Sequence, residues 1–146
     1  MPPTSVENGL SIMRQKFATD WAAANPTVLI ANENEEFALT YDANKRLDSF
    51  VRPVILISDR FQAAAVIAAA GTKMRRTIGV HSIGVFTAIG EGEGAGLSLV
   101  TSVQSILEGK NDTGVQWRAA NVDKVGSTGD AYHINVNIQF YFDTFE

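Results

Sequence analysis

One stretch near the C-terminus decides the fold class: Tyr132-His133-Ile134-Asn135-Val136-Asn137-Ile138-Gln139-Phe140-Tyr141-Phe142. The apolar side chains from Ile134 to Phe142 fall on even-numbered positions, whereas His133, Asn135, Asn137 and Gln139 alternate with them. Successive side chains of a strand point to opposite faces of its sheet, so this alternation predicts a strand with one face in the core and one polar face.

Further strands are predicted at 27–31, 49–58, 74–89 and 114–122, and Phe37, Leu39 and Tyr41 alternate like a strand edge. Polar or glycine-rich turns are predicted at 42–48 and 126–130. In the long segment 74–89, Ile78 and Val80 fall on one phase and Ile83 and Val85 on the other. This slip predicts a β-bulge or a change of face near His81-Ser82.

Two amphipathic helices complete the pattern. The first is predicted to begin with a capping box between Thr4 and Glu7 and to end at Asn25-Pro26. Its apolar stripe is Val6, Leu10, Met13, Phe17 and Trp21, and that of the second helix, which Gly109 ends, is Leu99, Val100, Val103, Ile106 and Leu107. We therefore expect one α+β domain over residues 1–146: a mixed, mainly antiparallel β-sheet, two amphipathic helices packed on one face, and a long β-hairpin.

Residues 59–71 fit two structures. Their alanines favour a helix by propensity, but the segment lies between two strands and has almost no polar face. A short helix and a long apolar hairpin tip are both compatible with the pattern. A helical or irregular excursion is the preferred interpretation.

Composition points to contact with partner proteins. Charged residues make up 19% of the chain, against about 25% in an average soluble domain, which is typical of a surface that partners cover. The formal net charge is −4 and the closest basic run is only Lys73-Met74-Arg75-Arg76, so a broad nucleic-acid footprint is not expected. No signal-peptide pattern and no apolar run of roughly 20 residues appear, which predicts a soluble, intracellular product.

The chain lacks the motifs of catalysis and of cofactor binding. It has no cysteine, and the glycine-rich turn at 90–96 lacks the Gly-Lys-Ser/Thr ending of a phosphate loop. His81 and His133 each stand alone in a strand, without a second ligand at metal spacing, and are interpreted as solvated. Trp21 and Trp117 are interpreted as core or interface anchors. We expect no enzyme activity, no cofactor and no metal.

Several segments, taken in order, resemble a known family. They are Trp21-Ala22-Ala23-Ala24-Asn25-Pro26, Asn32-Glu33-Asn34, Phe50-Val51-Arg52, Ile78-Gly79-Val80 with Phe86, the glycine-rich turn, a helix ending at Leu107, and the aromatic-ended stretch 129–142. Over nearly the whole chain this series resembles the tail terminator proteins of long-tailed bacteriophages. Phe50 stands where a tryptophan is expected in that family.

The resemblance implies a virion structural protein without a cofactor. It would form a homo-hexameric ring at the head–tail junction, cap the tail tube, end tail polymerisation and bind the head-completion or connector protein. It would be made in the host bacterial cytoplasm, and DNA would pass through the ring without specific binding and without any membrane partner. Another neck or tail-completion subunit, and a small-ligand-binding or enzymatic α+β protein, are the alternatives.

A ring requires that one patch of a subunit meets a different patch of the next. The candidate interface residues are Arg52, Phe61, Val66, Ile67, Arg75, Arg76 and Arg118. Glu91 and Glu93 are candidate lumen-facing residues, because like charges would keep DNA from sticking to the channel wall.

Overall fold

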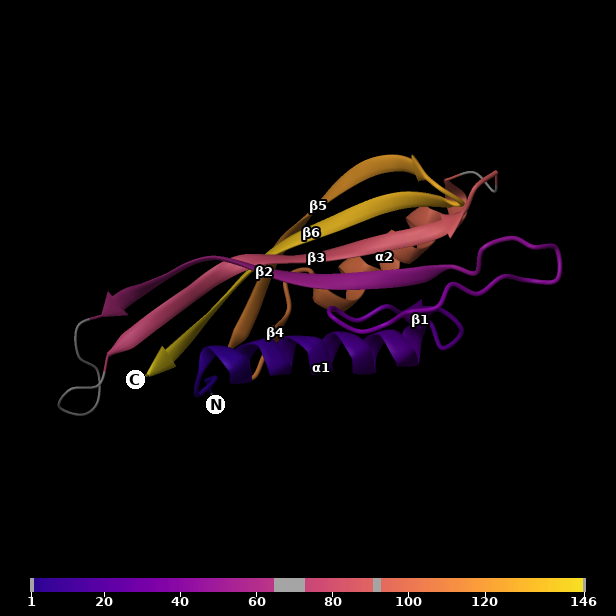
Figure 1. The fold of residues 1–146 in the computed structure, drawn as a ribbon. Coiled ribbons are helices and arrows are strands. Elements are labelled where there is room, and N and C mark those ends of the chain that lie inside the picture. The colour runs from indigo at the N-terminus through magenta and orange to yellow at the C-terminus, as the bar shows by residue number, and fades with distance from the viewer. Residues whose placement is uncertain (1, 65–72, 91–92, 146) are drawn as a thin grey trace.

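The computed structural model describes residues 2–64, 73–90 and 93–145. Over these ranges it contains two helices, α1 (Val6–Ala24) and α2 (Gly94–Leu107), and a six-stranded sheet (Figure 1). The strands are β1 (Leu29–Ile30), β2 (Phe50–Ala64), β3 (Met74–Ala88), β4 (Asn111–Asp112), β5 (Val115–Thr128) and β6 (Ala131–Phe145). The spatial order is β1-β2-β3-β6-β5-β4, and only the β1–β2 pair is parallel. The predicted α+β class, with its mainly antiparallel sheet and long hairpin, is confirmed.

The core lies between the two helices and one face of the sheet, called here the inner face. The β6 alternation is confirmed, because its inner-face side chains are almost fully buried: Ile134, Val136, Ile138, Phe140 and Phe142. Helix α1 covers them with Met13, Phe17 and Trp21, and α2 with Val100, Val103 and Leu107. Trp21 and Trp117 are core residues, and the Asn25 amide joins the helices by donating to Ser102 Oγ at 2.8 Å.

The first helix begins one residue later than predicted. Ser5 is its N-cap, and the Ser5 hydroxyl accepts the Asn8 N–H at 3.0 Å. The Asn8 side chain reaches back and accepts the Thr4 N–H at 3.0 Å. The proposed Thr4–Glu7 box is therefore wrong, because a serine–asparagine pair satisfies the same free N–H groups. The predicted end is confirmed, since α1 stops at Ala24.

Several predicted strand limits are wrong. β2 continues to Ala64, so residues 59–64 form a strand of a long hairpin and not the preferred helical or irregular excursion. The 37–41 alternation makes only an isolated bridge from Tyr41 to Leu47. β5 extends to Thr128 across a bulge between Lys124 and Gly126, which shortens the predicted 126–130 turn. Pairing with a neighbouring strand extends β2 and β5 beyond the predicted limits, and the lack of a pairing strand keeps 37–41 from forming a strand. Strand pairing thus outweighs the local sequence preference in each case.

Strand β3 contains no bulge at His81-Ser82. It pairs with β6 in unbroken register from Met74 to Ala88, and the bulges lie in its neighbour β2 and in β5. Odd-numbered β3 residues from Thr77 to Thr87 face inwards throughout. Ile78 and Val80 therefore lie on the outer face, away from the helices. The phase change in the sequence shows that the apolar residues of β3 occupy the outer face in its first half and the inner face in its second half.

Candidate assembly surfaces

Three of the predicted interface residues meet on the outer face of the sheet. Phe61, Arg76 and Arg118 line one hollow of about 340 Å³ together with Ile78, Val80 and Tyr141. Strand register explains the meeting, because Phe61 lies opposite Arg76 on β3, and Ile78 lies opposite Tyr141 on β6. We call this the tyrosine hollow.

Cations surround the Tyr141 ring. The Arg76 guanidinium lies 4.5 Å from the ring centroid, and that of Arg118 lies 5.1 Å from it. Arg76 is also held by a bidentate pair with Asp143, at 2.8 and 2.9 Å, and this hydrogen bonding raises the pKa of Arg76. The Arg76 guanidinium is thus already paired with a carboxylate of its own chain. Arg118 is exposed and is the better placed of the two to bind a carboxylate of a partner.

The remaining predicted interface residues do not join this hollow. The Arg52 guanidinium lies 5.9 Å from the Phe50 ring centroid and 5.6 Å from that of Phe86, in a stack of rings that continues to His133. Arg75 lies half-buried on β3 beside Arg76 but on the opposite face of that strand. Val66 and Ile67 lie outside the described residues.

The predicted lumen residues are only partly described. Glu91 lies outside the described residues. Glu93 precedes α2, and its carboxylate accepts from Lys124 Nζ and from the Tyr132 hydroxyl, each at 3.0 Å. The Lys124 hydrogen bond lowers the pKa of the exposed Glu93 carboxyl, followed by the Tyr132 hydrogen bond. Glu93 is therefore paired with Lys124 at the surface.

The sheet has two different edges. β1 covers only the start of β2, and beyond it β2 exposes Leu56, Ile57 and Phe61, at 56%, 46% and 42% of their surfaces. At the other side β4 covers only the start of β5, and Val125 is 51% exposed further along. Unpaired strand edges with apolar side chains are templates for pairing with another chain.

Carboxylates cap backbone N–H groups of both edge strands. Glu33 accepts the Ile55 N–H of β2 at 3.2 Å, and Pro53 nearby has no N–H to offer. Glu108 accepts the Ala120 N–H of β5 at 2.6 Å. Such caps blunt an edge, and they leave β2 open only from about Ile57 onwards. Sequence reasoning missed both caps, because each glutamate reaches a residue at least twelve positions away.

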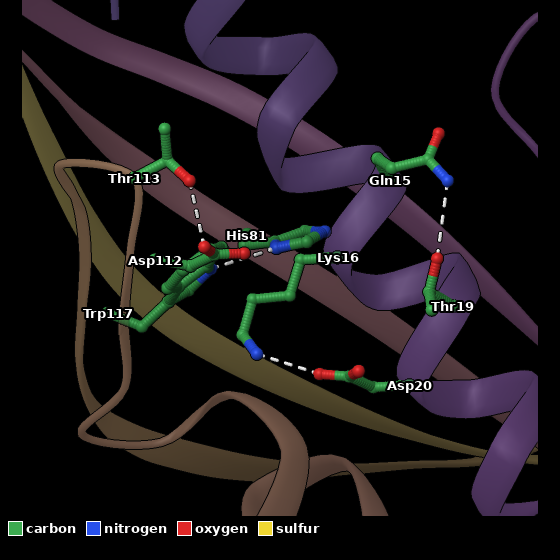
Figure 2. Close-up of polar contacts among 8 residues, drawn as sticks. All are labelled: Gln15, Lys16, Thr19, Asp20, His81, Asp112, Thr113 and Trp117. Carbon is green, nitrogen blue, oxygen red and sulfur yellow. Dashed lines mark hydrogen bonds and ion pairs between the residues drawn. The ribbon is translucent and has the colours of Figure 1, made fainter. Parts of the chain in front are cut away.

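The interpretation of His81 as a solvated histidine is wrong. His81 is fully buried on the inner face of β3, where its Nδ1 accepts the Trp117 indole N–H at 3.2 Å (Figure 2). Burial, followed by the charge of Arg14, lowers the pKa of His81 to about 3. His133 is half-buried, stacked on Phe86 at 4.1 Å between ring centroids. The sequence did contain a signal for this burial, because His81 falls on the same odd-numbered phase as the apolar residues Ile83 and Val85.

Within the described ranges, no three His, Cys, Asp or Glu side chains are grouped so that they could hold a metal ion. No described helix is long and apolar enough to cross a membrane.

No protein-family model matches the sequence, and no curated protein matches it. Nine chains of solved structures match the fold. One of them, a protein named only by a sequence identifier, has a TM-score of 0.60 and 14% sequence identity, with 91% of this chain and 94% of that chain covered. Similarity at this level of identity shows the fold alone. The same arrangement of helices and strands therefore recurs in another protein over nearly its whole length.

Proposed function

We propose that this chain is a structural protein of a long-tailed bacteriophage that assembles into a ring at the head–tail junction. The ring caps the tail tube, ends its polymerisation and presents a surface to the head connector. The chain acts without a cofactor and without catalysis. The family resemblance of the sequence supports the phage assignment, and one structural observation supports the ring: two open sheet edges of different composition and opposite direction.

The direction of the two edges suits a ring. β2 and β5 are separated by three antiparallel pairings, β2–β3, β3–β6 and β6–β5, so they run in opposite directions. Rotation about a ring axis places the β5 edge of one subunit beside the β2 edge of the next. Their opposite directions allow antiparallel strand pairing. A contact between two different patches is what a closed ring requires.

Exposed apolar side chains give this contact a driving force. Leu56 and Phe61 lie on the outer face next to the open β2 edge, and Arg118 on β5 borders the same tyrosine hollow. Burial of one such side chain contributes about 1.5–3 kcal/mol. A subunit edge seated here would bury them together.

The double variant Leu56→Asp/Phe61→Asp is expected to weaken ring formation at least about tenfold, because two charges would enter an apolar contact. Sedimentation velocity, with and without the tail-tube protein of the same virus, measures ring formation. Leu97→Asp is the matched control, since Leu97 is 39% exposed on α2, away from the sheet edges. Both variants are expected to keep the fold, because the substituted side chains lie outside the core.

A wild-type chain that stays monomeric at high concentration, even beside the tube protein, would overturn the ring. The small-ligand-binding alternative would then be favoured. Equal loss of assembly in Leu97→Asp would show that the β2 edge is not the contact.

Removing the edge caps is expected to have the opposite effect. Glu33→Ala and Glu108→Ala each free one backbone N–H for pairing between chains, so self-association should begin at roughly two- to tenfold lower concentration. Concentration-dependent light scattering measures this, with Glu36→Ala as control because Glu36 is exposed on the loop that carries Glu33. Unchanged association in both variants would mean that these edges do not meet.

A further inference from the structure

The His81 ring has one engaged nitrogen and one without a partner. Nδ1 accepts the indole N–H of Trp117, so the neutral ring carries its proton on Nε2. Nε2 is buried and has no hydrogen-bond partner among the described residues. A buried donor without a partner is destabilising, and such groups in native proteins are nearly always satisfied by protein, water or ligand.

His81 lies at the base of a hollow, and its Nε2 is covered from solvent. His81 forms part of the lining of a cavity of about 610 Å³, beside Arg14 and Gln15 of α1 and Pro53 and Ile55 of β2. Trp117 approaches His81 from the β5 side, whereas Pro53 and Ile55 lie on its β2 side. Figure 2 shows the second ring nitrogen on the side turned away from Trp117, towards α1. The N–H therefore lies under the floor of this hollow.

A second donor converges on the same space. The Arg14 side chain is 57% exposed on the rim, and its guanidinium comes no nearer than 3.9 Å to the Glu33 carboxylate. That carboxylate oxygen already accepts the Ile55 N–H. Arg14 and His81 line the same cavity, and the charge of Arg14 lowers the pKa of His81. Two donors thus lie at one hollow, and the Glu33 carboxylate on its rim is the printed ion-pair partner of Arg14.

We propose that this hollow is a binding site for a carboxylate group, with one oxygen accepting from His81 Nε2–H and the other from Arg14. A carboxylate has two acceptor oxygens for two donors, whereas an amide has one. Glu33 and Glu35 on the rim repel a phosphate dianion more strongly than a carboxylate monoanion. The carboxylate belongs either to a small organic acid or to an acidic side chain of a protein. The proposal does not rest on the proposed ring, although the site shares Glu33 with the capped part of the β2 edge.

Titration followed by NMR tests the site, with the Trp117 indole N–H and the His81 ring nitrogens as reporters. Sodium acetate is the small-acid probe and the blocked peptide acetyl-Gly-Glu-Gly-amide is the side-chain probe, each at constant ionic strength against sodium chloride. Either probe is expected to give a saturable shift of both reporters. Tighter binding of the peptide identifies a protein side chain as the source, and tighter binding of acetate identifies a small acid.

Arg14→Gln is expected to weaken carboxylate binding at least tenfold. Arg118→Gln removes a guanidinium from the opposite face of the sheet and should leave binding unchanged. Glu33→Ala should strengthen binding, because it removes a competing carboxylate. The proposal is overturned if neither probe gives a saturable shift, if chloride gives the same shift, or if Arg14→Gln binds like wild type; water alone then satisfies His81.

Discussion

Acidification from pH 6.5 to pH 3 is expected to remove about 4 kcal/mol of stability through His81 alone. The ordinary pKa of a histidine is 6.5, and burial, followed by Arg14, lowers that of His81 to about 3. Between these values the unfolded chain binds a proton that the folded chain excludes. The free energy of unfolding therefore falls as the pH falls through this window, and the His81 contribution is fully present above pH 6.5.

The variant His81→Gln isolates this effect from the titration of carboxylates. Glutamine keeps an acceptor for the Trp117 indole N–H but cannot be protonated, so its stability should depend much less on pH between 6.5 and 3. Urea denaturation at several pH values measures the difference between the two chains. His133→Gln is the control, because His133 is only half-buried and the lowering of its pKa by burial is opposed by its hydrogen bond to Asn135.

Parallel loss of stability in wild type and His81→Gln would contradict the burial of His81. A loss confined to wild type and His133→Gln would support it. The same window would bear on the proposed assembly, since His81 belongs to β3, the strand that pairs with β2.

Substitution of Gly79 by alanine is expected to cost about 3 kcal/mol or more. An added Cβ would overlap the backbone oxygen of Leu56 and lie 2.9 Å from the Cζ atom of the buried Phe140 ring. The overlap with Leu56 cannot be relieved by a side-chain rotation, because a backbone atom of β2 would have to move. Gly79 pairs with Ile57, where the β2 bulge begins, so the same change would displace the start of the open edge.

Gly94→Ala is the matched control for this substitution. Gly94 begins α2, and an added Cβ there meets open space. Alanine should therefore leave stability unchanged or raise it by up to about 1 kcal/mol through helix propensity. Chemical denaturation distinguishes the two outcomes. Wild-type stability in Gly79→Ala would show that β2 and β3 are not in contact at this bulge.

The fold class could be read from the sequence because it depends on local periodicity. Apolar residues alternate in β6 and recur every three or four positions in α1 and α2. These patterns predict which side chains are buried. The helix end at Asn25-Pro26 is local as well. The length of the 59–64 arm is not local, since its alanine-rich continuation favours a helix and only pairing with β3 holds it extended.

The candidate surfaces depended on register. Phe61, Arg76 and Arg118 were chosen separately from the sequence, and only the alignment of β2, β3, β6 and β5 brings them around Tyr141. The Asp143 partner of Arg76 was not foreseen, because the two residues are 67 positions apart.

The sequence by itself determined that a sheet with one apolar face is covered by two amphipathic helices, since that information repeats every two or every three to four residues. Only the tertiary structure decided that His81 is buried, that one of its nitrogens has no partner among the described residues, that glutamates cap both edge strands, and which edges stay open. These features depend on contacts between residues far apart in the chain, and burial and hydrogen bonding are set by such neighbours.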